Sequence, residues 1–215
     1  MKPFPKRLKL ADLPTRIEKL ERFSERTGLN VYVKRDDMSG MEWSGNKIRK
    51  LEFSIQEALD RGADTLITCG GIQSNHCRAT AAAAARLGLR SCLLLRTDDP
   101  DPLLDGNYFI DKVLGADIRF ISAEDYRSRR GEVMEELAGE FERQGHKAYI
   151  IPEGASNGIG TFGYLSCMQE ILQQEKEMGV QFDTIVDAVG SGGTLAGLVL
   201  ATRLYGLNKR IVGIN

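Results

Sequence analysis

The sequence predicts an α/β fold with mainly parallel, open sheets. Short apolar or β-branched runs alternate with longer stretches that carry apolar residues at helical spacing. Such alternation is typical of strand–helix–strand units, in which right-handed crossovers join parallel strands. Glycine-bearing turns follow several of the runs, at the carboxyl ends of strands where ligands bind in such sheets.

The expected strands are the short runs rich in apolar or β-branched residues: 31–34, 65–69, 91–95, 118–121, 148–151, 184–189 and 211–214. The expected helices lie between them, at 47–61, 75–87, 124–144, 158–178 and 194–205. The first of these helices repeats apolar residues every three or four positions. The second is rich in alanine, the strongest helix former.

Composition narrows the class of protein. The chain has 215 residues, a formal net charge of −1, and 42 % hydrophobic and 27 % charged residues, as in an ordinary folded protein. The balanced charge argues against a nucleic-acid or membrane-surface partner. The four cysteines form no C-x-x-C pair, so we expect buried thiols and no metal site. We find no signal-peptide pattern and no run of roughly 18 apolar residues, and expect a cytoplasmic protein.

Five small residues follow the run 184–189 and open a predicted helix: Gly190, Ser191, Gly192, Gly193 and Thr194. We call them the glycine loop. Small residues let backbone N–H groups converge on an anion, and a helix start adds favourable partial charge. The pattern favours a phosphate cradle; the alternative is a tight turn without a ligand. Leu195 stands where a dinucleotide-binding loop has its third glycine, which points to another phosphorylated cofactor.

Lys47 lies in the first turn of a predicted helix, directly after a Ser-Gly-Asn segment. A cation there opposes the helix dipole, which together with burial lowers the pKa of the amine and makes it a nucleophile. Lys50 and Arg49 compete for this role. As the alternative, all three are surface residues, with Lys50 pairing Glu57 and Arg49 pairing Glu52 on an exposed helix face.

A polar loop, residues 70–76, joins the run 65–69 to the alanine-rich helix. Ser74 and Asn75 are common helix-capping residues, so capping is one interpretation of the loop. More polar side chains follow the strand than one cap needs, and we therefore favour a loop that faces a ligand. We interpret His76 as a surface histidine.

Together with the segment 34–37, these motifs resemble the 1-aminocyclopropane-1-carboxylate deaminase / D-cysteine desulfhydrase family. Members of that family are fold type II, tryptophan-synthase-β-like enzymes that use pyridoxal 5′-phosphate. The likeness runs in order along nearly the whole chain. The string Gly-Asn-Lys-Ile-Arg-Lys-Leu-Glu, residues 45–52, carries it most specifically.

The resemblance implies a role for each motif. Lys47 is similar to the lysine that binds the cofactor aldehyde covalently, and the glycine loop is similar to the phosphate-binding loop. Asn75 matches the residue that forms a hydrogen bond with the 3′-oxygen of the pyridine ring. Ser74 matches a serine beside the substrate carboxylate, where it serves as a nucleophile or assists the base. The resemblance thus implies Lys47 and Ser74 as catalytic residues.

The resemblance also implies breakdown of a small amino acid. The favoured prediction is β-elimination of D-cysteine to pyruvate, sulfide and ammonia. The alternative is ring opening of 1-aminocyclopropane-1-carboxylate to 2-oxobutanoate and ammonia. Two other classes of protein remain as alternatives. One is a nucleotide-dependent oxidoreductase, which Leu195 disfavours. The other is a truncated relative that binds phosphate or cofactor without turnover.

The family has two domains and forms a homodimer in the complete protein. Its plan maps residues 1–50 and 163–215 to the larger, cofactor-binding domain and residues 51–162 to the smaller α/β domain. Family members continue well beyond the position of Asn215, so we expect the larger domain to be incomplete here. The absent part would supply the group facing the pyridine nitrogen and a substrate-side tyrosine. A smaller departure is Arg16, where the family often has proline.

Overall fold

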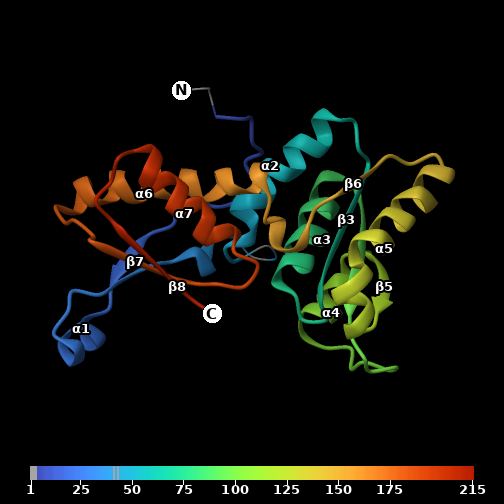
Figure 1. Ribbon diagram of the computed structural model, residues 1–215, viewed down its shortest axis with the longest axis horizontal. Helices are drawn as coiled ribbons and strands as arrows, with labels where there is room; N and C mark the ends of the chain where they lie inside the picture. Colours follow the sequence, from blue (N-terminus) through green and yellow to red (C-terminus); the bar gives the residue numbers. More distant parts are fainter. Residues whose placement is uncertain (1–3, 41, 43) are drawn as a thin grey trace.

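A four-stranded parallel sheet forms the centre of one half of the molecule, in the order β5-β4-β3-β6. The computed structural model describes residues 4–40, 42 and 44–215. The strands of this sheet are β3 (Thr65–Gly71), β4 (Arg90–Arg96), β5 (Asp117–Ile121) and β6 (Ala148–Ile150). The helices around it are α3 (Asn75–Leu87), α4 (Gly106–Val113) and α5 (Ala123–Arg143) (Figure 1).

Side-chain alternation along these strands feeds two cores, one on each face of the sheet. Ile67 and Leu94 pack with α5, whereas Leu93 packs with α3 and α4. The central strands are buried except at their ends, as expected for a parallel sheet covered on both faces. All four cysteines are buried and free, which confirms the expected buried thiols.

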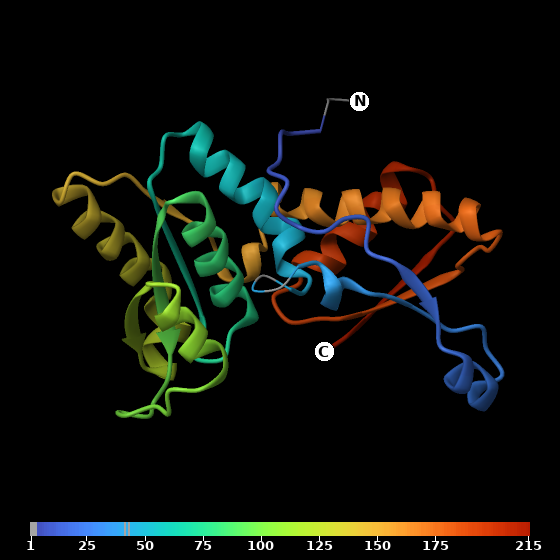
Figure 2. The same ribbon diagram turned by 180° about the vertical axis from the view of Figure 1, so that it is seen from behind.

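The other half contains two small sheets and two long helices. Strands β7 (Thr184–Ala188) and β8 (Arg210–Ile214) pair in parallel, beside α6 (Gly158–Met178) and α7 (Gly193–Leu204). Strands β1 (Ile17–Lys19) and β2 (Tyr32–Lys34) pair antiparallel. Between them α1 (Glu21–Thr27) projects from the body of the molecule (Figure 2).

Helix α2 (Lys47–Asp60) lies where the two halves meet (Figures 1 and 2). It packs against α3 on one side and α6 on the other. The approach to α6 is close because Gly163 has no side chain: a Cβ there would lie 2.5 Å from the backbone oxygen of Arg49. Two short 3-10 helices, η1 (Asp36–Met38) and η2 (Glu153–Ala155), complete the connections to this region.

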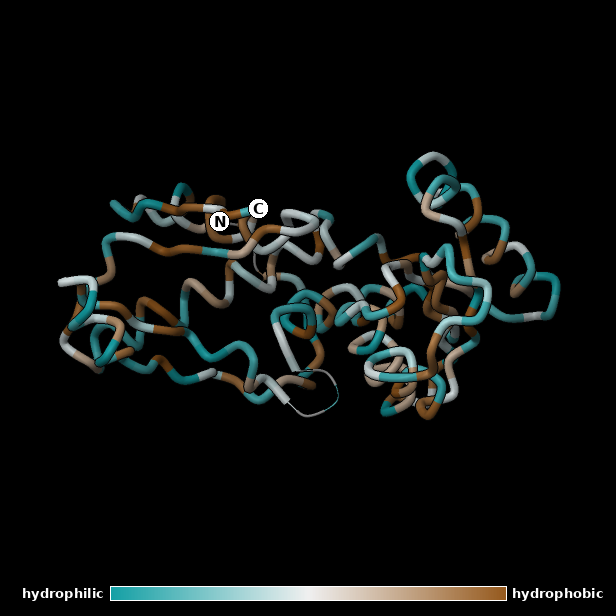
Figure 3. Tube along the Cα trace, turned by 90° about the horizontal axis from the view of Figure 1, so that it is seen from below, coloured by the Kyte–Doolittle hydropathy of each residue, from teal (hydrophilic) through white to brown (hydrophobic). Residues whose placement is uncertain are grey.

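The predicted α/β class with mainly parallel sheets is confirmed, and each expected strand and helix is present with its bounds shifted by at most two residues. The sequence did not reveal β1, α1 and α4, because three to eight residues are too few to establish a clear period. Hydrophobic and hydrophilic stretches alternate along the chain in both halves (Figure 3).

None of the described helices has the length and apolar character needed to cross a membrane. Within residues 4–40, 42 and 44–215, no cluster of three or more His, Cys, Asp or Glu side chains is arranged to hold a metal ion.

The contact between α2 and α6 leads to a stability prediction. Gly163→Ala should lower the free energy of unfolding by about 1–3 kcal/mol, because its methyl group would overlap the backbone of α2. The matched control is Gly131→Ala on α5, which has open space and should raise stability by about 0.5–1 kcal/mol. Urea denaturation measures both, and equal effects of the two substitutions would contradict the close packing.

Candidate functional site

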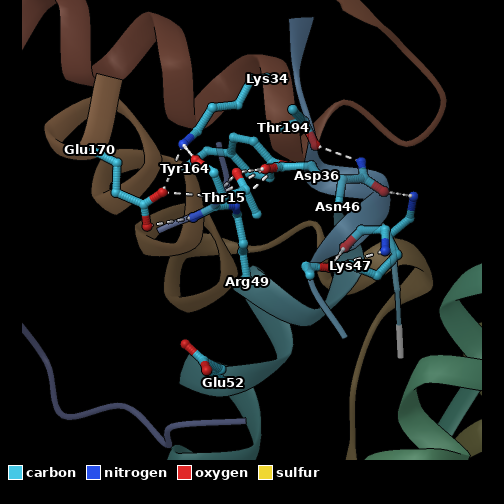
Figure 4. Close-up of polar contacts among 12 residues, drawn as sticks. Thr15, Lys34, Asp36, Asn46, Lys47, Arg49, Glu52, Tyr164, Glu170 and Thr194 are labelled. Atoms are coloured by element: carbon cyan, nitrogen blue, oxygen red, sulfur yellow. Dashed lines mark hydrogen bonds and ion pairs between the residues drawn. The ribbon is translucent and has the colours of Figure 1, made fainter. Parts of the chain in front are cut away.

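Lys47 and the glycine loop lie together, although 143 positions separate Lys47 from Gly190. Lys47 is the first residue of α2, and its Nζ donates a hydrogen bond to Oδ1 of Asn46 at 2.7 Å. Asn46 in turn donates through Nδ2 to Oγ1 of Thr194 at 2.9 Å (Figure 4). Asn46 therefore joins the amine of Lys47 to the glycine loop.

These residues line one small pocket between the start of α2 and the end of β7. Its lining consists of Asn46, Lys47, Lys50, Asp187, Ala188, Val189 and the whole glycine loop. Two amines, one carboxylate and a row of backbone amides thus face a shared space. Lys47 and the glycine loop therefore line the same pocket.

The glycine loop leaves backbone donors available at the start of α7. Gly192 adopts a left-handed conformation, with φ +84°, and no side chain caps the helix that begins at Gly193. The first N–H groups of a helix have no partner within it, so here they can bind an anion. Gly193 must remain small, because a Cβ would lie 2.5 Å from Oγ of Ser156.

Lys50 is a pocket residue that the sequence left as a competitor for the role of Lys47. It lies one turn further along α2 and is only 1 % exposed. Burial, together with the nearby charge of Lys47, lowers the pKa of Lys50 to about 7. Burial also lowers the pKa of Lys47, while the carboxylate of Asp187 opposes this shift. Both amines therefore lose protons more readily than a surface lysine.

Sequence reasoning did not single out Asp187. It stands in an apolar run near the end of β7, on the face that holds Ile185. Its Oδ2 is buried and has no hydrogen-bond partner among the described residues. Burial raises the pKa of the carboxyl group against the opposing effect of the two lysines. The sequence signal that could have indicated Asp187 is a single charged residue within an otherwise apolar strand.

The surface ion pairs considered for α2 are wrong. Arg49 is fully buried and donates to both carboxylate oxygens of Asp36 and of Glu170, at 2.8–2.9 Å (Figure 4). Glu52 is also buried and accepts hydrogen bonds from the backbone N–H groups of Leu10 and Ala11. The helix face that carries them is covered by the N-terminal segment and α6, so neither side chain lies at the surface.

Ser74 and Asn75 do not line the pocket. Ser74 caps α3, because its Oγ accepts a hydrogen bond from the backbone N–H of Cys77 at 3.2 Å. Oδ1 of Asn75 accepts hydrogen bonds from Arg78 and from Nδ2 of Asn107. Capping thus explains the position of Ser74, whereas the amide nitrogen of Asn75 remains to donate to a ligand.

The interpretation of His76 as a surface histidine is wrong. His76 is 3 % exposed and its Nε2 lies 2.8 Å from Oγ1 of Thr68. Burial, aided by the charges of Lys50 and Lys47, lowers the pKa of the imidazole to about 3, so the ring is neutral at physiological pH. The histidine is part of the packing beneath the site.

The chain is similar to known enzymes. Residues 8–215 match the family model described as "Pyridoxal-phosphate dependent enzyme". A putative 1-aminocyclopropane-1-carboxylate deaminase of Pyrococcus abyssi is 46 % identical over 212 residues, which cover 99 % of this chain and 63 % of the relative. A D-cysteine desulfhydrase of Serratia proteamaculans is 40 % identical over 215 residues, which cover 98 % of this chain and 64 % of the relative.

A bifunctional D-cysteine desulfhydrase/1-aminocyclopropane-1-carboxylate deaminase of Arabidopsis thaliana, described as mitochondrial, is 45 % identical over 219 residues. The match covers 98 % of this chain and 55 % of that protein. Among solved structures, an ACC deaminase homologue superposes with a TM-score of 0.89 at 42 % identity, covering 98 % of this chain and 63 % of the other. The present chain thus spans roughly three fifths of these relatives, and it belongs to the pyridoxal-phosphate-dependent enzyme family.

Proposed function

We propose that this chain provides the cofactor-binding part of an enzyme that breaks down a small amino acid. The proposed reaction is β-elimination of D-cysteine to pyruvate, sulfide and ammonia. The observation that carries the proposal is the single pocket that unites Lys47 with the glycine loop. The named activities of the relatives from Serratia and Arabidopsis support D-cysteine as the substrate.

The donor set of the pocket fits pyridoxal 5′-phosphate. Backbone N–H groups of the glycine loop, together with Lys50, would hold the phosphate, and Lys47 would bind the aldehyde. We assign the amide nitrogen of Asn75 to donate to the 3′-oxygen of the ring, because the amide oxygen of Asn75 already accepts two hydrogen bonds. When bound, this cofactor supplies an electron sink for the carbanion that forms at the substrate.

The protein's own part in the reaction is proton handling and orientation. Lys47 is assigned to carry the proton from the α-carbon, because its lowered pKa makes the neutral amine available near neutral pH. Ser74 is assigned to the substrate side, beside the carboxylate. His76 is buried and neutral, and we assign it no contact with the substrate.

Ring opening of 1-aminocyclopropane-1-carboxylate is the second candidate, supported by the names of the relatives from Pyrococcus and Arabidopsis. This substrate lacks an α-proton, so Lys47 could not begin the reaction in the same way. Product analysis separates the two candidates: D-cysteine yields pyruvate and sulfide, whereas the cyclopropane yields 2-oxobutanoate.

We also propose the two-domain division, with residues 51–162 as the smaller domain and residues 1–50 and 163–215 as part of the larger one. The two groups of sheets on either side of α2 support this division (Figure 1). A homodimer and a cytoplasmic location are further proposals for the complete protein. Measuring the mass of the protein in solution tests the homodimer, and fractionating cells tests the location.

The first prediction concerns the lysine that binds the cofactor. Incubation with pyridoxal 5′-phosphate followed by borohydride reduction should label Lys47, because its amine lies beside the glycine loop. Peptide mapping by mass spectrometry identifies the labelled residue. Lys176→Gln, in the exposed last turn of α6, is a control outside the pocket and should leave the labelling unchanged. Label on Lys50 alone would contradict the assignment.

The second prediction concerns pH. A phosphate monoester, with a second pKa of about 6, is fully dianionic above pH 8. Its binding favours protonated Lys50, so above the folded-state pKa of about 7 each binding event takes up a proton. Affinity should therefore fall as pH rises from 8 to 9.5, by up to about tenfold per unit. Calorimetry with phenyl phosphate measures how affinity changes with pH. An equal pH dependence in Lys50→Met would contradict the assignment of Lys50 to the phosphate.

The third prediction separates capping from catalysis at Ser74. Loss of the cap in Ser74→Ala should lower the free energy of unfolding by about 0.5–2 kcal/mol, and Ser74→Gly by a few tenths. If Ser74 also acts on the substrate, both variants should lose about 10²–10⁴-fold in D-cysteine turnover. Turnover is measured as pyruvate formed from D-cysteine. Normal turnover with lowered stability would leave Ser74 only its structural role.

A further inference from the structure

Arg78 joins three segments of the chain that meet near the site. From the first turn of α3, its Nε donates to the backbone oxygen of Glu42 at 2.8 Å and its Nη2 to that of Ser44 at 2.7 Å. Its Nη1 donates to Oδ1 of Asn75 at 3.0 Å and to Oδ1 of Asn107 at 2.9 Å. Ser44 stands three positions before Lys47, so one guanidinium group ties the approach to α2 to the starts of α3 and α4.

These hydrogen bonds are directed to neutral oxygens. Among the described side chains, no carboxylate forms an ion pair with Arg78. Asp111 lies near enough to act through its charge, but both its oxygens are buried and have no hydrogen-bond partner in the described part of the chain. A planar guanidinium with several fixed donors is suited to holding separate acceptors in a defined geometry.

Asn75 is oriented by this arrangement. Its Oδ1 accepts from Nη1 of Arg78 and from Nδ2 of Asn107 at 2.9 Å, so both lone pairs of the amide oxygen are engaged. An amide whose oxygen is held by two donors presents its NH₂ group on the other side. The two contacts thus determine that Asn75 offers a donor to a ligand and not an acceptor.

Asn107 is itself fixed by the loop before α3. Its backbone N–H donates to Oε1 of Gln73 at 2.7 Å, and its Nδ2 also donates to the backbone oxygen of Gln73 at 2.8 Å. Nε2 of Gln73 donates to Oδ1 of Asp105 at 2.8 Å. Gln73 therefore ties the loop before α3 to the start of α4.

We propose that Arg78 is a positioning residue of the cofactor site. With Asn107, it turns the NH₂ group of Asn75 toward the 3′-oxygen of the cofactor, and it holds the backbone oxygens of Glu42 and Ser44, which precede Lys47. The proposal rests on the proposed function and adds to it two residues that lie outside the pocket lining formed with the glycine loop. Their substitution should weaken recognition of the ring oxygen and leave phosphate recognition intact.

The test compares two ligands. Pyridoxal 5′-phosphate carries the 3′-oxygen, and its 3-deoxy analogue lacks it. The wild-type chain should prefer the first ligand, and Arg78→Lys should reduce the ratio of the two dissociation constants by about tenfold, since a lysine cannot hold the fork of contacts. Binding of inorganic phosphate should stay within about twofold of wild type.

Two further variants complete the design. Asn107→Ala removes one of the two donors to Asn75 and should shift the same ratio in the same direction by less. Arg127→Lys, on the exposed surface of α5, is the matched control and should change nothing. If Arg78→Lys does not fold, the ratio of the two dissociation constants in Asn107→Ala tests the proposal.

Different results overturn the two proposals. If Arg78→Lys and Asn107→Ala weaken both ligands equally, or leave the ratio at its wild-type value, Arg78 has a structural role only and the inference is wrong. If the wild-type chain neither prefers the ligand with the ring oxygen nor attaches it to Lys47, the proposed function fails first.

Discussion

A buried cluster of charges around Arg49 holds the site together. Its guanidinium contacts Asp36 at the end of the N-terminal sheet and Glu170 in α6, and it also donates to Oγ1 of Thr15 (Figure 4). Tyr164 adds a hydrogen bond from its hydroxyl to Asp36 at 2.6 Å. A charge buried so completely is tolerated only when it is paired and fully hydrogen-bonded. The requirement to satisfy Arg49 therefore fixes α2 against α6 and the N-terminal segment.

The position of the pocket follows from this anchoring. Lys47 and Lys50 flank Arg49 on the same helix, so the anchor that holds Arg49 also determines where both amines lie. On the facing side, α7 is drawn close to α6 because Gly197 lets the helices approach: a Cβ there would lie 2.4 Å from Cβ of Tyr164. The start of α7 is thereby presented to the start of α2, with the glycine loop between them.

Local motifs in the sequence predicted the parts of this site that depend on local structure. Lys47 at a helix start and the glycine loop after a strand follow from spacing and backbone chemistry alone. Burial of Arg49, Lys50 and His76 could not be predicted this way, because it depends on which distant segment covers each side chain. The partners of Arg49, for example, lie 13 and 121 positions away. The same limit applies to Asp187, whose neighbours come from α2.

A crystal structure of the chain grown with pyridoxal 5′-phosphate tests the central claim most directly, namely that anchoring by Arg49 places a reactive lysine beside a phosphate cradle. The account predicts the phosphate on the backbone N–H groups of the glycine loop, within reach of Lys50, and continuous electron density from Nζ of Lys47 to the cofactor. Phosphate bound away from the glycine loop, or density joining the cofactor to a lysine other than Lys47, would contradict it.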